Sequence, residues 1–176
     1  MTTLNIIEEA LSFNFAPIFL RKNSKIPLLK QWNVLFDPTK YLEYSIKFPY
    51  NNIGILTGIF SNIIIIDIDI RNGGLEEWNL LLKKNNKKIN TPLVQTASGG
   101  FHYYFKYNEE YEKYKFFLYD PEEKRKINGI DILKTGKQAV YPGSIINDKV
   151  YKWIISPKDC NIKKVPKWLF QYFLLK

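Results

Sequence analysis

The chain is poor in the residues that build disulfides and zinc sites. It has one cysteine, Cys160, and one histidine, His102, among 176 residues. This excludes an internal disulfide and a structural zinc site of the usual Cys/His kind. No apolar run approaches the ~20 residues that cross a bilayer, and Met1–Ala10, which carries Glu8 and Glu9, contains no apolar signal core. We therefore expect an intracellular, soluble protein that is not secreted and has no membrane partner.

Acidic residues are the scarcer charged class. The 17 Asp and Glu stand against 26 Lys and Arg, a net charge of +9. Such a surface favours a polyanionic partner, such as nucleic acid, an anionic membrane or nucleotide phosphates, although the same charge can serve solubility alone. Hydrophobic residues make up 45% of the chain, which is long enough to bury a core. We predict a single domain over residues 1–176, because no repeat or linker divides the sequence.

Hydrophobic spacing predicts an α+β domain. Helices are predicted over residues 3–13, 40–48, 75–85 and 166–175. Strands are predicted over residues 16–20, 53–57, 63–69, 93–96, 101–107, 130–133, 138–141 and 151–154. The polar, charged and aromatic stretch 108–126 is predicted to be a variable excursion. The short connections favour mostly antiparallel pairing in a sheet of about six or more strands.

A pair of acids follows the most hydrophobic run of the chain. Ile63–Ile66 leads directly into Asp67, and Asp69 comes two residues later. Residues two apart in a strand share a face, so the two carboxylates are expected on the same side. Like charges raise each other's pKa, and a bound divalent cation would remove that cost. The pair therefore indicates a metal clamp; the alternative is a strand end that exposes two acids to solvent.

A third acid, Asp131, lies between two isoleucines in a predicted strand, where aspartate is disfavoured. If Asp131 lies beside Asp67 and Asp69, three carboxylates could hold two metals ~3.5–4 Å apart. Mg²⁺ or Mn²⁺ suits such a site, because hard cations prefer oxygen ligands. The alternative is a lone acid on the solvent face of an edge strand.

The only histidine follows a glycine turn, in the segment Ser98-Gly99-Gly100-Phe101-His102. Glycines let the backbone approach a ligand and can expose amides to phosphate. His102 begins a strand, which would hold its ring rigidly. A phosphate here could be contacted by both the imidazole and the glycine amides; the alternative is a structural histidine after an ordinary hairpin turn.

Taken in order, these segments resemble the primase–polymerase (Prim-Pol) domain of the archaeo-eukaryotic primase superfamily, found at the N-terminus of bifunctional DNA primase/polymerases. The segments that carry the resemblance, from about residue 16 to 155, are Lys25-Ile26-Pro27 with Trp32, Asn52-Ile53-Gly54 with Thr57-Gly58, Ile66-Asp67-Ile68-Asp69 with Asn72-Gly73-Gly74, Ser98-Gly99-Gly100-Phe101-His102, Ile130-Asp131, Tyr141-Pro142-Gly143-Ser144 and Tyr151-Lys152-Trp153. No single motif decides the matter, but their ordered sum is specific.

The resemblance implies an RRM-like catalytic sheet, mixed or antiparallel and flanked by helices, beside a smaller N-terminal α/β part. It implies that Asp67, Asp69 and Asp131 are the catalytic, metal-binding acids. The residues that it assigns to nucleotide binding are His102, Ser98, Gly99, Gly100, Lys25 and Lys134. The chain departs from the family at two positions: Gly100 stands where many members have serine, and Lys134 follows the third acid one residue later than the usual basic residue.

The activity implied is that of a metal-dependent DNA primase/polymerase, which adds an NTP or dNTP to a nucleic-acid 3′ end on a DNA template and initiates primers. Its cofactor would be Mg²⁺ or Mn²⁺. Its partners would be template and primer DNA, nucleotides, and a replicative helicase in the same or another chain, in the cytoplasm or at a host replication site. Two alternatives stay open: a metal-dependent glycosyltransferase that uses the Asp-x-Asp pair, and a catalytically inactive nucleic-acid-binding module.

Overall fold

The computed structural model describes residues 2–176 and has an α+β architecture. Its α-helices are α1 (Thr3–Ser12), α2 (Tyr41–Lys47), α3 (Gly74–Lys84) and α4 (Lys167–Phe170), and its 3₁₀ helices are η1 (Pro38–Lys40), η2 (Ile70–Asn72) and η3 (Glu109–Lys113). Its strands are β1 (Ala16–Phe19), β2 (Ile53–Leu56), β3 (Ile63–Ile68), β4 (Leu93–Gln95), β5 (Phe101–Lys106), β6 (Tyr114–Asp120), β7 (Arg125–Leu133), β8 (Gln138–Val140), β9 (Ile145–Ile146), β10 (Lys149–Val150), β11 (Lys152–Ile155) and β12 (Phe173–Leu175).

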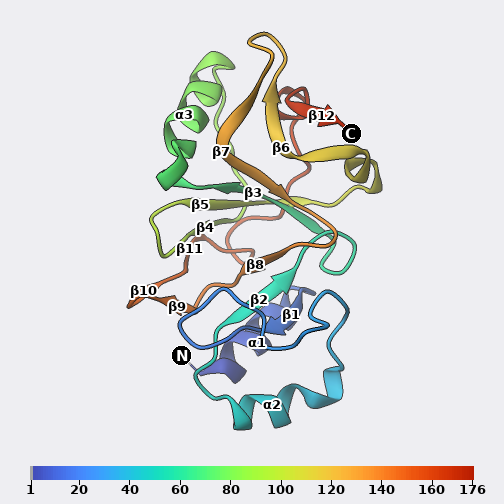
Figure 1. Cartoon of the computed structure of the whole chain (residues 1–176), viewed down its shortest axis with the longest axis vertical. Helices are drawn as coiled ribbons and strands as arrows, with labels where there is room; N and C mark the ends of the chain where they lie inside the picture. The colour runs from blue at the N-terminus through green and yellow to red at the C-terminus, as the bar shows by residue number, and fades with distance from the viewer. Residues whose placement is uncertain (1) are drawn as a thin grey trace.

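Within residues 2–176 the strands form a large sheet, a small sheet and a hairpin. The large, seven-stranded sheet has the order β11-β4-β5-β3-β7-β6-β12, and the small one has the order β1-β2-β8. Strands β9 and β10 form the hairpin. Neighbouring strands in all three pair antiparallel, as the short connections predict. Figure 1 shows the large sheet in the upper half of the molecule, with the small sheet, α1 and α2 below it.

The isoleucine run forms the central strand of the large sheet and is buried on both faces. Ile63 and Ile65 pack into the core shared with the small sheet and α1. Ile64 and Ile66 pack on the opposite face, in the core that contains Trp78 of α3. A strand covered on both sides reads as a continuous hydrophobic run. The two faces of the large sheet are therefore distinct, and one of them looks toward the small sheet.

Two predicted segments differ from the structure. Residues 108–126, predicted to be a variable excursion, form η3, β6 and the start of β7. The closing helix predicted over residues 166–175 is limited to α4, and the chain then pairs as β12 with β6. The second difference follows from the first, because β12 needs the edge of β6 to pair with. None of the helices in residues 2–176 has both the length and the apolar character to cross a membrane.

Candidate active site

Three of the predicted site residues form one row across the middle of the large sheet. Asp67 of β3 lies directly opposite His102 of β5 on one side and Asp131 of β7 on the other. Residues directly opposite each other in antiparallel strands share a face, with Cβ atoms roughly 4.5–5.5 Å apart. Asp67 also follows Ile63 and Ile65 in alternation, so the row lies on the face that looks toward the small sheet.

His102 is held rigidly at one end of this row. Its side chain is only 6% exposed, and its Nε2 lies 3.4 Å from Oδ1 of Asp67. The ring centroid of Tyr151 is 5.9 Å away. Among the described residues, Nδ1 of His102 is buried and has no hydrogen-bond partner. A buried polar atom without a partner is costly. The other ring nitrogen, Nε2, lies beside the carboxylate of Asp67, which lines a cavity.

The three predicted acids line a common cavity of about 380 Å³, together with Asn72, Lys126, Asn128 and Gly129. The side chain of Asp131 is 59% exposed here, and its Oδ1 lies 3.9 Å from Nζ of Lys126. Partial burial raises the pKa of Asp131 above its ordinary value, and the charges of Asp67 and Asp69 raise it further against the opposing effect of Lys126. The cavity thus gathers three negative charges, which Lys126 offsets at Asp131 and Arg71 offsets at Asp69.

Asp69 lines the cavity but is engaged in local contacts. It follows the last residue of β3 and caps η2, where Oδ1 accepts a hydrogen bond from the backbone N–H of Arg71 at 3.0 Å. Nη2 of Arg71 donates to Oδ2 at 2.8 Å, and Nδ2 of Asn72 donates to the same oxygen at 3.1 Å. The hydrogen bonds from Arg71 hold the pKa of Asp69 below its ordinary value. Both oxygens of Asp69 are therefore occupied by groups of its own turn.

A second, basic cavity of about 320 Å³ lies on the histidine side of the row. Its lining residues are Lys25, Arg71, Ala97, Ser98, Ile146, Asn147, Lys149 and Tyr151. Nζ of Lys25 lies 6.0 Å from the ring centroid of Tyr151, the same ring that packs on His102. Arg71 joins this cavity to the acids through Asp69. The structure thus places Lys25 and Ser98, two of the residues that the resemblance assigns to nucleotide binding, in the wall of one cavity.

A buried asparagine fixes the loop that carries Lys25. Nδ2 of Asn52 donates to the carbonyl of Ser24 at 3.1 Å and to that of Ile145 at 2.7 Å. Its Oδ1 accepts from the backbone N–H of Ile145 at 2.9 Å. Asn52 therefore ties the lysine loop to β9, and both segments contribute to the wall of the basic cavity.

The glycine turn lies close to the end of β3 at Gly100. Gly99 has φ +92, a left-handed conformation that favours glycine. A Cβ on Gly100 would lie 2.2 Å from the carbonyl oxygen of Ile68, so the turn approaches β3 more closely than a side chain permits. The hydroxyls of Thr96 and Ser98 are 3.0 Å apart. The serine two residues earlier in the turn, and not residue 100, thus supplies the hydroxyl in the basic cavity.

Lys134 does not join the other predicted site residues. Its side chain is fully buried, and its Nζ donates to the carbonyls of Tyr111 and Tyr114 at 2.7 Å each. Oε2 of Glu112 lies 3.6 Å from the same nitrogen. Burial lowers the pKa of Lys134 below its ordinary value. Strand alternation places Lys134, three residues after Asp131, on the opposite face with Ile130 and Ile132, and the assignment of Lys134 to nucleotide binding is corrected to a structural role.

The acids have the chemistry of a hard-cation site but are not closed around one. Within residues 2–176, no group of three or more His, Cys, Asp or Glu side chains is gathered tightly enough to hold a metal ion. Asp67 and Asp131 face each other across neighbouring strands and offer oxygen donors. To bind a cation, the carboxylate of Asp69 would have to break its ion pair with Arg71. The donor set fits Mg²⁺ or Mn²⁺ on the condition that this ion pair opens.

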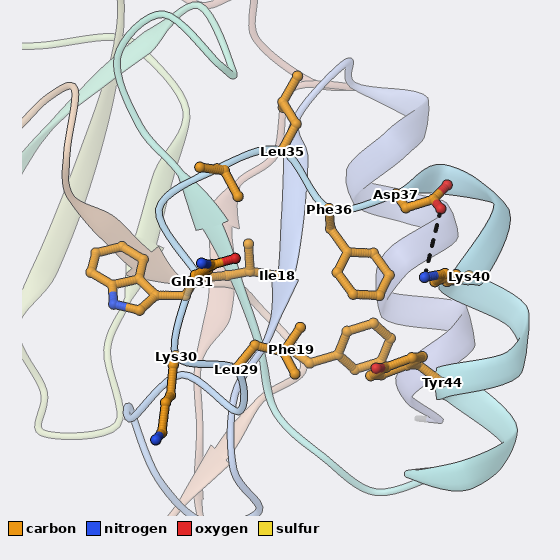
Figure 2. A pocket seen from close by; sticks show the side chains of 12 residues that line it. Ile18, Phe19, Leu29, Lys30, Gln31, Leu35, Phe36, Asp37, Lys40 and Tyr44 are labelled. Atoms are coloured by element: carbon orange, nitrogen blue, oxygen red, sulfur yellow. Dashed lines mark ion pairs between the residues drawn. The ribbon is translucent and has the colours of Figure 1, made fainter.

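A separate apolar hollow of about 510 Å³ lies in the lower part of the molecule, where η1 and α2 follow the loop at residues 28–37. Figure 2 shows Phe19, Phe36 and Tyr44 grouped along one side, with the Asp37–Lys40 ion pair close by. The predicted site residues are not among those that line it. The hollow is therefore distinct from the row of acids.

Sequence reasoning missed three charged residues of the two cavities. Arg71 follows Asp69 by two residues, a spacing that suits a capping turn after a strand. Lys126 and Lys149 lie in lysine-rich stretches without a distinguishing pattern. Tyr151 belonged to one of the segments that carried the resemblance, but without a role. Of these residues, only Arg71 has a sequence position, two residues after a capping aspartate, from which its contact with Asp69 could have been predicted.

Comparison with known proteins assigns the chain to a family. None of the curated sequences compared with the chain is similar enough to be a relative. The sequence model of the family "Bifunctional DNA primase/polymerase, N-terminal" (Prim-Pol) matches residues 7–168, which is most of the chain and includes both cavities. With the acids, the histidine and the glycine turn all inside the matched region, the chain belongs to the Prim-Pol family of bifunctional DNA primase/polymerase N-terminal domains.

Proposed function

We propose that the chain is a metal-dependent nucleotidyltransferase that adds an NTP or dNTP to a nucleic-acid 3′ end on a DNA template. The observation that carries the proposal is the row His102–Asp67–Asp131, in register on one sheet face with a basic cavity at its histidine end. The face that bears this row would be the catalytic face of an RRM-like sheet. The small sheet would be the accessory part that supplies Lys25.

In this proposal the basic cavity holds the phosphates of the incoming nucleotide. Lys25, Arg71 and Lys149 supply positive charge, and Ser98 supplies a hydroxyl donor. Guanidinium and ammonium groups bind phosphate through charge-assisted hydrogen bonds. His102 lies between this cavity and Asp67, where its ring would orient a phosphate toward the acids.

Asp67 and Asp131, joined by Asp69 once it leaves Arg71, would hold Mg²⁺ or Mn²⁺. The cation, when bound, supplies positive charge that activates the 3′-hydroxyl and stabilises the pyrophosphate leaving group. The residues themselves position the reacting groups: the acids lie one strand spacing apart, and His102 and the cavity lysines fix the phosphates. The expected reaction is in-line attack of the 3′-hydroxyl on the α-phosphate, which releases pyrophosphate.

The nucleotide phosphates would also release Asp69. A phosphate in the basic cavity competes for the guanidinium of Arg71, which now pairs with Asp69 and lines the same cavity. Nucleotide binding and assembly of the acid site would then be coupled. Primer initiation and a helicase partner, in the same or another chain, rest on family membership alone and belong to the same proposal.

A second candidate is a nucleic-acid-binding module without catalysis. The observation that favours it is the engagement of Asp69 by Arg71 and Asn72, together with the lack of a gathered metal cluster in the described residues. Retention of all three acids in one cavity favours the enzyme. The glycosyltransferase alternative loses ground, since the family match covers the acids and the glycine turn together.

The deciding experiment is incorporation of labelled nucleotide on a primed DNA template, with and without Mg²⁺ or Mn²⁺. We expect metal-dependent extension by the natural chain and its loss in Asp67→Asn and Asp131→Asn. Asp37→Asn is the matched control, since Asn caps η1 as well as Asp does and Asp37 lies outside both cavities. Extension without metal, or full activity of either acid variant, would refute the mechanism. DNA binding without incorporation under any condition would favour the inactive module.

A further inference from the structure

The row of side chains does not end at Asp131. Phe117 of β6 lies directly opposite Asp131 of β7, so its half-buried ring is the next side chain on the same face. Alternation along β6 places Lys115 and Tyr119 on this face as well. Leu118, between them, is buried in the opposite core. We call Lys115, Phe117, Tyr119 and Lys126 the outer strip, since Lys126 is the cross-strand partner of Tyr119.

The outer strip combines aromatic rings with positive charge. Nζ of Lys126 lies 5.0 Å from the ring centroid of Phe117 and 3.9 Å from Oδ1 of Asp131. Rings interleaved with lysines are the arrangement that holds single-stranded nucleic acid, since bases stack on the rings while the lysines hold phosphates.

We propose that the outer strip seats a nucleic-acid strand whose terminal base stacks on Phe117, so that its 3′-hydroxyl reaches the acids. The identity of this strand as the one to be extended rests on the proposed function; its binding does not. In this structure the ammonium of Lys126 lies over the ring of Phe117. A phosphate of the bound strand would pair with that ammonium, and the ring would then be free to stack with the terminal base. Neighbouring strands are roughly 4.8 Å apart, so a base on Phe117 lies one spacing from Asp131 and two from Asp67.

The other end of the row leaves no room for this strand. Beyond His102 the face is occupied by Tyr151 and the basic cavity, which the lysine loop and the β9–β10 hairpin enclose. Lys126, Asn128 and Asp131, in contrast, are exposed. The acids therefore lie between a site suited to phosphates on the β5 side and an open aromatic surface on the β6 side.

The test is binding of a fluorescein-labelled single-stranded oligodeoxynucleotide in EDTA without nucleotide, so that catalysis plays no part. Phe117→Leu keeps an apolar side chain but removes the aromatic face. We expect it to weaken binding roughly 5- to 100-fold, the range for loss of one base–aromatic stack. Phe116→Leu is the matched control, because Phe116 precedes Phe117 in β6 and alternation turns its ring to the opposite face, where Nζ of Lys134 lies 4.7 Å from the ring centroid. Its binding is expected to stay within about twofold of the natural chain.

A second variant does not depend on how Phe117 packs. Lys126→Gln removes one exposed charge and should reduce the slope of log affinity against log salt by about one. Lys88→Gln removes an equal charge from an exposed position after α3 and should leave the slope unchanged. Should thermal melting show that Phe117→Leu unfolds, the lysine pair decides alone.

The outcomes are separable from those of the incorporation assay. Equal effects of Lys126→Gln and Lys88→Gln would mean that net charge alone attracts DNA, and would overturn the proposal. A larger loss in Phe116→Leu than in Phe117→Leu would put the strand on the opposite face and overturn it too. A Phe117-dependent loss of binding in a chain that incorporates no nucleotide would support the outer strip while refuting the proposed function.

Discussion

Replacing Lys134 with methionine tests whether this lysine is structural. Lys134→Met keeps much of the side-chain volume but removes the donors to the carbonyls of Tyr111 and Tyr114, each now at 2.7 Å. A hydrogen bond to a charged group contributes about 1.5–3 kcal/mol, and removing one partner of a buried pair costs about 3–5 kcal/mol. Relief from burying the ammonium offsets part of this. We expect a net loss of about 3 kcal/mol in the free energy of unfolding.

The assay is urea or thermal unfolding of the natural chain and of Lys134→Met. The KM for nucleotide is measured for both proteins at a temperature well below either unfolding midpoint. A loss of about 3 kcal/mol lowers the midpoint by roughly 6–12 °C in a chain of this size. The KM for nucleotide should not change, because Lys134 lines neither cavity. Unchanged stability with a clearly raised KM would refute this reasoning and would indicate that Lys134 binds the nucleotide phosphates.

The pH dependence of the same pair of proteins gives an independent check. Burial lowers the pKa of Lys134 in the folded state, so the unfolded chain binds this proton more tightly. The cost of the buried charge is therefore complete below the folded pKa and is relieved as pH rises toward the unfolded value of about 10.4. The stability difference between the natural chain and Lys134→Met should widen as pH rises through this window. Ionisation of tyrosines, common to both proteins, cancels in the difference.

Three further predictions concern the cavities and one turn. His102→Ala should raise the KM for nucleotide more than it lowers kcat, since a phosphate contact present in ground and transition states is lost uniformly. A collapse of kcat at constant KM would instead indicate acid–base chemistry. Arg71→Gln should tighten Mn²⁺ binding without nucleotide by about two- to fivefold, because the exposed guanidinium would no longer compete with the cation for Asp69. Weaker Mn²⁺ binding in a titration would contradict this release of Asp69. Burial raises the pKa of Asp120, but hydrogen bonds from backbone N–H groups and the charge of Lys84 outweigh burial and hold that pKa below its ordinary value. The ionised Asp120 therefore stabilises the fold above pH ~4, and this stabilisation is lost as the pH falls further. Acid unfolding of Asp120→Asn should show a smaller fall in stability below that pH, and an unchanged acid profile would contradict it.

Strand alternation predicted the acid site only in part. Asp67 and Asp69 were expected on one face, and both do line one cavity. The strand ends at Ile68, however, and Asp69 then follows the local chemistry of a capping aspartate. Short acidic side chains compete for nearby backbone N–H groups, so spacing alone could not reveal that Asp69 is engaged by Arg71. The pairing of Asp67 with Asp131 came from the resemblance, because the register between two strands that are distant in the sequence cannot be predicted from the residues of either strand.

The segments predicted wrongly share a cause. Charged and aromatic residues alternate imperfectly in Tyr114–Asp120, so the strand looked like an irregular excursion. Its partner Phe173–Leu175 then looked like the end of a helix. Strand preference depends on the neighbours that a segment meets in the sheet more than on its own residues. Helix α1, whose capping Thr2 and buried stripe are local features, was predicted to within one residue at its C-terminus.

The division of the chain between its two sheets has a consequence for modularity. The small sheet takes β1 and β2 from the first part of the chain, but its third strand, β8, comes from residues 138–140. The chain passes between the two sheets through the segments 57–62, 134–137 and 141–151. Excision of residues 1–50 would therefore strip β2 of one neighbour and uncover the core beneath β8. The two sheets should melt together in a single calorimetric transition, and neither should be transplantable without the other.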